Sequence, residues 1–183
     1  MKIKLNLLLL SIFIIELTTQ NQINMENKNN ANAEGKVIKQ GKLIYSEIII
    51  KASVEKVWQT FTNFEKYPEW NPFIKSLKGT LTEDKKIEAF LQLPEKKGMT
   101  FKPTVLVYDS LKEFRWIGKL FIGRLFDGEH TFKLKDNKDG TVTFIQYERF
   151  RGILIPFMKK MLESNTQTGF NLMNTALKQR CEN

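Results

Sequence analysis

The only histidine of the chain, His130, lies in a stretch whose alternating side chains are typical of a β-strand. Within residues 128–135 the even positions carry Gly128, His130, Phe132 and Leu134, whereas lysines fall on the odd positions. The apolar face of such a strand packs toward the interior of the domain. The pattern therefore predicts that the imidazole points inward.

Two other polar side chains, Gln146 and Glu148, share the even face of a second predicted strand, residues 141–151. If the two strands are antiparallel neighbours, opposed Cβ atoms lie about 4.5–5.5 Å apart, so His130, Gln146 and Glu148 are expected to meet on one concave surface. A histidine beside a carboxylate can act as a general base or can hold the polar end of a ligand. The three groups can equally satisfy one another as buried polar side chains. Structural pairing, ligand orientation and catalysis all stay open at this point.

Apolar residues and glycines on the same inward positions, together with methionines on a C-terminal helix, would form the wall of a ligand pocket if this face holds one. Methionine is an unbranched, adaptable side chain that suits such a wall, although a methionine stripe at helical spacing is also ordinary core. Any catalytic role falls to His130 and Glu148. The predicted ligand-binding residues are Phe114, Trp116, Gly118, His130, Phe132, Phe144, Gln146, Glu148, Met158, Met161 and Met173.

The composition does not indicate a disulfide, a metal centre or a catalytic set built on serine or cysteine. The only cysteine, Cys181, cannot form an intramolecular disulfide or a thiolate metal site, and one histidine excludes a multi-histidine metal centre. With no second histidine or inward cysteine, neither a Ser/His/Asp nor a Cys/His set is indicated. We expect no metal and no cofactor.

The elements that position these residues follow from hydrophobic periodicity. A β-rich run at 43–51 is followed by an amphipathic helix from residue 54, with Ser53 as its N-cap, and by a Pro-containing turn or short helix at 63–72. Short strands separated by polar turns indicate an antiparallel meander, and the 3.6-residue period that returns from residue 154 predicts a long final helix. The strands of the meander are expected at 73–81, 87–93, 99–108, 114–121, 128–135 and 141–151. This order of elements predicts an α+β class.

The chain is basic, with a formal net charge of +9. The odd face of the late strands carries Arg115, Lys119, Lys133, Lys135, Arg149 and Arg151, which predicts a basic convex patch. We expect this face to be solvated, with peripheral contact to an anionic membrane as the next possibility. We do not expect nucleic acid as a partner, because no recognition helix and no aromatic ladder accompany the patch.

Three segments divide the 183 residues. Residues 1–20 begin with two lysines and continue into a short apolar run, which is typical of a signal peptide and too short to span a bilayer. Residues 21–40 are rich in Asn and are expected to be a disordered linker, and residues 41–183 form the folded domain. The expected location is export or membrane association through the leader. A true start at Met25 would instead place the protein in the cytoplasm.

The front of the domain resembles the START-related superfamily often called SRPBCC, which includes polyketide cyclase/dehydrase and lipid-transport proteins. The resemblance rests on a strand, an amphipathic helix with Val-Trp, and the run Tyr-Pro-x-Trp-Asn-Pro, and it covers about residues 41–182. Later agreement comes from Gly128-Glu129-His130-x-Phe132, Gly140-Thr141 and Glu148. The front residues that carry it are Ile50, Ala52, Ser53, Val57, Trp58, Phe61, Phe64, Tyr67, Pro68, Trp70, Asn71 and Pro72.

The resemblance implies a helix-grip (START-like) fold, in which a curved antiparallel sheet surrounds a long C-terminal helix. It also implies a cavity between sheet and helix for an apolar small molecule or lipid, in a protein expected to be a monomer. Two alternatives stay open: a small cyclase-, dehydratase- or hydrolase-type enzyme that uses His130 and Glu148, and a regulatory or chaperone-interacting module. Because fold does not fix function, these remain expectations.

Overall fold

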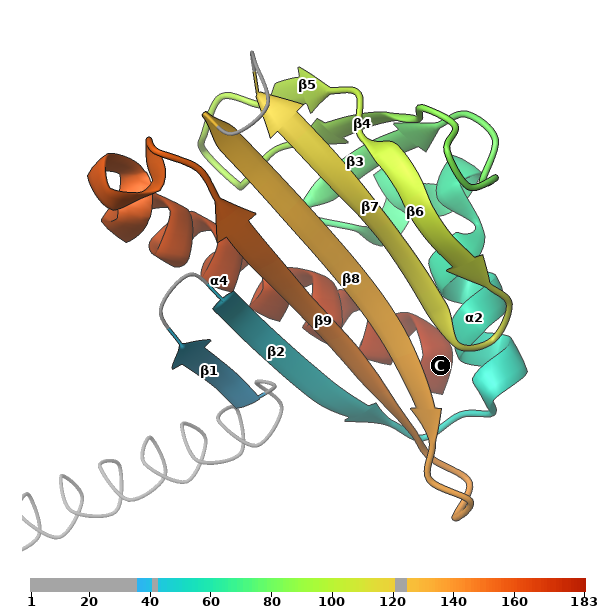
Figure 1. Ribbon diagram of the computed structural model, residues 1–183. Coiled ribbons are helices and arrows are strands. Elements are labelled where there is room, and N and C mark those ends of the chain that lie inside the picture. The colour runs from blue at the N-terminus through green and yellow to red at the C-terminus, as the bar shows by residue number, and fades with distance from the viewer. Residues whose placement is uncertain (1–35, 41–42, 121–124) are drawn as a thin grey trace, which may run out of the picture. The chain divides into compact units, whose positions relative to one another are not determined.

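A computed structural model describes residues 36–40, 43–120 and 125–183. Two antiparallel sheets form within this part of the chain, one of six strands in the order β1-β2-β9-β8-β7-β6 and one of three strands in the order β3-β4-β5. Strands β7, β8 and β9 are neighbours, as the meander predicted (Figure 1). The strands are β1 (Lys36–Gln40), β2 (Leu43–Ile50), β3 (Ile74–Lys78), β4 (Glu88–Leu91), β5 (Met99–Phe101), β6 (Thr104–Asp109), β7 (Glu113–Leu120), β8 (Phe126–Asp136) and β9 (Val142–Arg151).

The helices are α2 (Val54–Thr62), the 3₁₀ turn η1 (Phe64–Lys66), α3 (Tyr67–Trp70) and α4 (Ile155–Glu182). Ser53 caps α2 as predicted, because its side chain accepts a hydrogen bond from the backbone N–H of Lys56. After α3, the side-chain oxygen of Asn71 accepts from the backbone N–H groups of residues 73 and 74 and so turns the chain into β3. Helix α4 runs across one face of the larger sheet and packs against β2, β9 and α2 (Figure 1).

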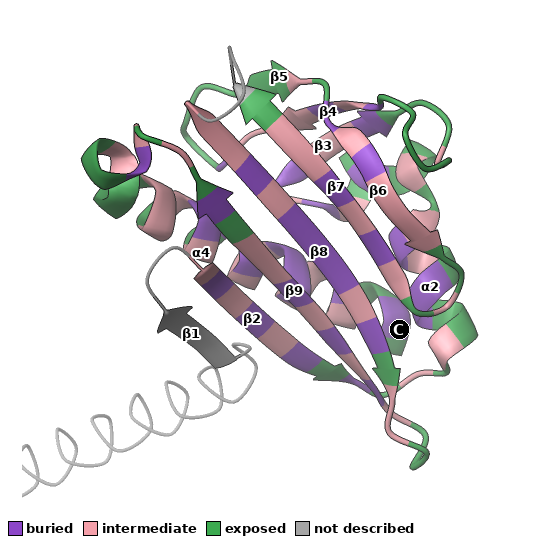
Figure 2. Cartoon of the chain, in the orientation of Figure 1, coloured by how far each residue is buried: buried purple, intermediate pink, exposed green. Residues whose placement is uncertain are grey.

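Burial alternates along the central strands, as Figure 2 shows for β7, β8 and β9. On β9 the even positions Val142, Phe144 and Gln146 are buried, and the odd positions between them are half-buried. The inward face was therefore assigned correctly from the period of two. The helix-grip α+β class is confirmed: a curved antiparallel sheet holds a 28-residue C-terminal helix.

The structure differs from the expected elements in two segments. The single strand expected at 99–108 is two strands, β5 and β6, because Pro103 lies between them and has no backbone N–H for a sheet ladder. Strand β1 pairs with β2 and lies within the range predicted as a disordered linker. The leader (1–20) and the remainder of the predicted linker (21–35) fall outside the described residues.

Helix α4 approaches the smaller sheet closely at one glycine. A Cβ at Gly169 would lie 2.5 Å from the ring of Phe73, so only a residue without a side chain fits there. Among the described helices, none has both the length and the hydropathy that a membrane span requires.

Candidate functional site

A cluster of aromatic side chains fills the space between the centre of the large sheet, α2 and α4. Phe61 of α2 lies 4.9 Å from Phe132 of β8 and 5.3 Å from Phe144 of β9, measured between ring centroids. Phe114 of β7 stacks on Phe132 at 6.0 Å. These rings are fully buried, so the middle of the concave face is packed core.

His130 belongs to this packed region. The imidazole is 2% exposed and stacks between Phe132, at 4.0 Å, and Phe170 of α4, at 4.7 Å. Trp116 makes a T-shaped contact with the imidazole, with ring centroids 5.4 Å apart. Burial among these rings lowers the pKa of His130 to about 3, since a cation there would lose its hydration. The imidazole is therefore neutral at physiological pH.

A chain of hydrogen bonds joins His130 to helix α4. Gln146 Oε1 lies 3.3 Å from His130 Nε2, while Gln146 Nε2 donates to Asn174 Oδ1 at 2.6 Å and to the backbone carbonyl of Phe170 at 3.2 Å. Asn174 Nδ2 in turn donates to Ser46 Oγ at 2.7 Å. Because the amide of Gln146 directs its oxygen at the ring, His130 carries its proton on Nε2. We call His130, Gln146, Asn174 and Ser46 the polar chain.

Glu148 was expected beside His130, and the two residues are direct cross-strand partners in the register of β8 and β9. Of the three polar groups expected to meet here, the imidazole bonds to Gln146 and not to Glu148. The carboxyl group of Glu148 lies over Gly128, where a Cβ would be 2.7 Å from Oε1. It makes no hydrogen bond or ion pair with another described residue.

Desolvation raises the pKa of Glu148 to about 8, and no nearby cation opposes this shift. The carboxyl group is consequently mostly protonated at neutral pH. A protonated carboxyl can donate one hydrogen bond and accept another, so Glu148 is a polar group on the inner face whose bonding capacity is unused.

Apolar rings and two glycines surround this carboxyl group. Gly118 and Gly128 are cross-strand partners in β7 and β8. Phe150 lies within 3.6 Å of the position that a Cβ at Gly128 would take, and the ring of Phe101 in β5 covers Gly118 in the same way at 3.3 Å. We call Glu148, Gly118, Gly128, Phe101 and Phe150 the Glu148 site.

The sequence predicted the carboxyl group and both glycines of this site on the inner face. Its alternation also places Phe150 on that face, although Phe150 was not among the predicted ligand-binding residues. Phe101 comes from the separate three-stranded sheet, and no local pattern connects it with Gly118. Phe170 and Asn174 were also missed, because the periodicity of α4 was aligned on its methionines.

The predicted lining residues divide by position. Phe114, Trp116, Phe132, Phe144 and Met173 are buried, and Met158 and Gly118 are partly buried. The expectation that Met161 faces the interior is wrong, because its side chain is 52% exposed near the beginning of α4. The buried stripe of α4 instead includes Thr166, Phe170 and Asn174.

The described residues show no hollow around His130, contrary to expectation, since the stacked rings occupy that space. A depression of about 200 Å³ opens at another place, between α2 and the end of α4. Its two cations, Lys66 and Arg180, both pair with Glu69, at 2.7 and 3.2 Å. The depression is lined by polar side chains, and its positive charge is partly neutralised, so it does not suit an apolar ligand. Its lining residues are Gln59, Thr60, Asn63, Lys66, Trp70 and Arg180.

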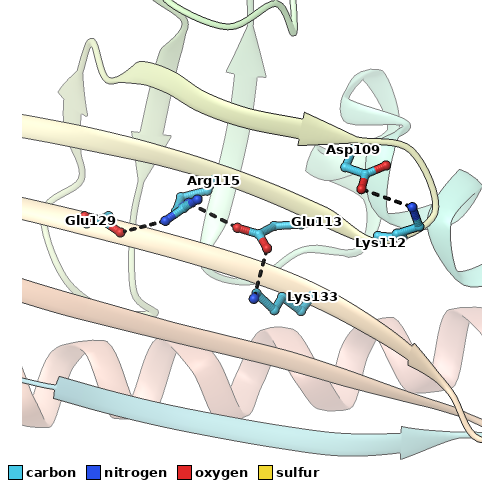
Figure 3. Close-up of polar contacts among 6 residues, drawn as sticks. All are labelled: Asp109, Lys112, Glu113, Arg115, Glu129 and Lys133. Atoms are coloured by element: carbon cyan, nitrogen blue, oxygen red, sulfur yellow. Dashed lines mark hydrogen bonds and ion pairs between the residues drawn. The ribbon is translucent and has the colours of Figure 1, made fainter.

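The basic residues expected on the convex face are partly neutralised. Glu113 pairs with both Arg115 (3.1 Å) and Lys133 (3.0 Å), and Glu129 pairs with Arg115 at 3.3 Å (Figure 3). Two of the six expected cations therefore have acidic partners. Among the described residues, no group of His, Cys, Asp and Glu side chains could hold a metal ion.

Comparison with known proteins agrees with this architecture. Residues 43–182 match the model of the family described as "Polyketide cyclase / dehydrase and lipid transport". Among curated proteins, none matches the sequence.

Solved structures share the fold at low sequence identity. A START superfamily protein from Mycobacterium smegmatis is 18% identical, with a TM-score of 0.61 over 78% of this chain and 98% of that one. A crystal structure of a protein from Chromobacterium violaceum is 15% identical, with a TM-score of 0.62 over 79% and 99% of the two chains. The di-domain ARO/CYC BexL from the BE-7585A biosynthetic pathway is 8% identical, with a TM-score of 0.60 over 77% of this chain and 50% of that one.

Proposed function

The chain belongs to the polyketide cyclase/dehydrase and lipid transport family, and we propose that it binds an apolar small molecule whose single polar group bonds to Glu148. The observation that carries this proposal is the inward carboxyl group of Glu148, which has no partner among the described side chains. Glu148 is half-buried on the inner face, and polar groups withdrawn from water are usually hydrogen-bonded, so its unbonded carboxyl is suited to a ligand.

The surroundings of Glu148 define the chemistry of the ligand. Phe101 and Phe150 offer apolar contact, and the two glycines remove side-chain bulk from the inner face of β7 and β8. A carboxyl group held protonated by desolvation favours a neutral hydroxyl, carbonyl or protonated acid over an anion. The ligand class is therefore an apolar molecule with one such neutral group.

Room for the ligand depends on the rings that now cover the glycines. Phe101 lies on the short edge strand β5, so rotation of its ring uncovers Gly118 at little cost to the packed core. The rings around His130 are held from three sides by β8, α2 and α4 and are expected to stay in place. The polar chain then forms the fixed floor of the site.

The catalytic alternative needs a histidine–carboxylate pair, and the described structure favours it less. His130 Nε2 already bonds to Gln146, and the low pKa of the imidazole makes it a poor proton acceptor at neutral pH. The polar chain thus agrees with structural pairing for His130 and Gln146.

Binding can be measured with Nile red, a neutral apolar dye, by fluorescence titration of the purified chain. We expect saturable binding at pH 7 that weakens as the pH rises through about 8, because ionised Glu148 would be a charge in an apolar site. Glu148→Gln keeps a neutral donor and acceptor, so its affinity should not change across this pH range. Glu148→Leu should bind about tenfold more weakly to any ligand that uses the carboxyl group.

Glu129→Gln is the matched control, since Glu129 lies on the outer face of the neighbouring strand and pairs with Arg115. This variant should bind like the wild type and keep the loss of affinity above pH 8. The proposal fails if wild type and Glu148→Gln show the same pH dependence, or if Nile red does not bind and extracts of the native protein contain no apolar molecule by mass spectrometry.

A further inference from the structure

Three large apolar side chains project into solvent where β9 passes into α4. Ile153 is 66% exposed, Phe157 is 88% exposed and Met161 is 52% exposed. Phe157 and Met161 are four residues apart in α4 and so lie on the same side of the helix, with Ile153 four residues earlier in the preceding turn. Single exposed apolar residues are common in proteins, but three within nine residues form a patch.

A cation accompanies the apolar residues. Lys160 is three residues from Phe157 and therefore adjacent to it on the helix surface. Neighbouring Lys159 has a partner, Glu163, at 3.9 Å, whereas Lys160 has no ion pair within the described part of the chain. The first turn of α4 contains no acidic residue. Lys160 is therefore available to contact an external anion.

The backbone holds this end of the helix in a defined position. Ile155 is 3% exposed, and the backbone N–H of Leu154 donates to the carbonyl of Leu125 at 3.1 Å. One side of the first turn is thus anchored to the domain while Phe157 points away from it. The first turns of α4 extend past the end of β9, and Figure 2 shows them largely exposed. We call Ile153, Phe157, Lys160 and Met161 the α4 tip.

We propose that the α4 tip docks on the surface of an anionic lipid bilayer. Phe157 and its apolar neighbours enter the boundary between headgroups and acyl chains, and Lys160 contacts lipid phosphate, as in other interfacial helices. This contact is peripheral. It does not require the Glu148 site to hold a ligand, so the two proposals stand or fall separately.

The positive charge of Lys160 favours a bilayer over a second copy of the chain as the partner that covers the α4 tip. Two α4 tips packed on each other would bring like charges of Lys160 together in an apolar contact, which is unfavourable. An anionic surface complements both parts of the tip, and the net charge of +9 adds long-range attraction. On the convex face, Glu113 and Glu129 pair with two of the cations, Arg115 and Lys133, and no cluster of exposed large apolar residues accompanies them among the described residues.

The test is co-sedimentation of the full chain with vesicles of phosphatidylcholine alone and of phosphatidylcholine with phosphatidylglycerol. The wild type should bind the anionic vesicles more strongly. Phe157→Ser should lower the partition coefficient about tenfold by removing the buried ring. Lys160→Glu should lower it about tenfold on anionic vesicles and have little effect on neutral ones.

Two control variants test whether vesicle binding depends on the α4 tip itself or on exposed apolar residues and positive charge anywhere on the surface. Ile49→Ser removes another exposed apolar residue, 56% exposed on β2, and Lys85→Glu reverses another exposed lysine, in the turn between β3 and β4. Both should change partitioning by less than about twofold, because neither lies in the tip. Residues 5–17 are the same in all these proteins, so their contribution cancels in the comparison.

Three results would overturn the proposal. The first is equal binding by wild type and Phe157→Ser. The second is equal loss for Lys160→Glu and Lys85→Glu, which would mean that only net charge matters. The third is a wild-type dimer in light scattering that Phe157→Ser dissociates, since the tip would then be a contact between two copies.

Discussion

His130 and Glu148 are opposed residues on neighbouring strands, and burial shifts their pKa values in opposite directions. The pKa of His130 falls to about 3 and that of Glu148 rises to about 8, so both groups are neutral over much of the intermediate range. Each shift links folding to pH. Stability should be greatest in mildly acidic solution and fall on both sides.

Glu148 accounts for the expected loss of stability as the pH rises. Its folded-state pKa of about 8 lies above the ordinary value of 4.5, so the native state holds the proton more tightly and stability is lost as the pH rises through 8. We expect Glu148→Gln to gain about 2 kcal/mol relative to wild type between pH 6 and pH 9, allowing for partial exposure of the carboxyl. Urea unfolding at the two pH values measures this. Identical slopes for the two proteins would contradict it.

His130 accounts for the expected loss of stability as the pH falls. Because its pKa is lowered from 6.5 to about 3, the unfolded chain binds the proton more tightly, and stability is lost as the pH falls from 6.5 toward 3. His130→Gln should be less stable than wild type at pH 7 but should lose less stability on acidification, by about 3 kcal/mol between pH 6.5 and pH 4. Chemical denaturation at these pH values tests the difference, and parallel losses would refute it.

Helix α4 is held to the sheet at two kinds of contact, one polar and one steric. The polar chain connects it to β2, β8 and β9 through Asn174, and the bare surface of Gly169 lies against Phe73. These contacts fix the rotation of the helix about its axis. The methionines were assigned inward because only hydrophobic spacing was used, whereas Asn174 and Thr166 are polar residues on the buried stripe.

Removing Asn174 should leave one N–H of Gln146 without its acceptor in the core, and Ser46 Oγ without its donor. We expect Asn174→Ala to lower the free energy of unfolding by about 2 kcal/mol. Asn171→Ala is the matched control, since Asn171 is only partly buried and its contact with Ser46 is long, at 3.5 Å. Thermal and urea denaturation should show a much smaller loss for the control, and equal losses would mean that the polar chain adds nothing.

Adding a methyl group at Gly169 tests the steric contact. Alanine normally stabilises a helix relative to glycine, by about 1 kcal/mol. Here the Cβ would lie 2.5 Å from the ring of Phe73, so we expect Gly169→Ala to destabilise the protein by about 2 kcal/mol. Thr168→Ala, at the exposed neighbouring position, should be nearly neutral. A gain in stability for Gly169→Ala would show that α4 can move away from β3 freely.

At the scale of the whole molecule, the sequence predicted most of the fold because its signals are local. The alternation in β8 and β9, the Ser53 cap and the long 3.6-residue period each depend on neighbouring residues. The contacts that the sequence did not predict come from separate elements: Phe101 over Gly118, Phe170 and Asn174 of α4 against the sheet, and the packed rings around His130. Periodicity indicates which face a residue occupies but not which of two inward polar groups its neighbour will bond.

The charge of the convex face was also predicted only in part from the sequence. The basic residues of the odd faces were identified correctly, but Glu113 and Glu129 lie among them and pair across strands. A count of cations on one face therefore overstated its potential. The unpaired Lys160 and the exposed Phe157 were not recognised, because the α4 tip is defined by where the helix extends beyond the sheet.

The leader at residues 1–20 stays a prediction. We expect the protein isolated from its native cell to begin after residue 20, because the apolar run has the length of a signal peptide. N-terminal sequencing measures this directly. A chain that begins at Met1 or at Met25 would contradict export by cleavage.

Because His130 is buried, its chemical reactivity can report how often helix α4 separates from the sheet. Only one imidazole exists in the sequence, and stacked rings cover it in the native state. A histidine-selective reagent such as diethyl pyrocarbonate can therefore label that ring only in molecules whose helix has separated from the sheet. The rate of labelling in dilute reagent would give the frequency of that separation without any introduced probe.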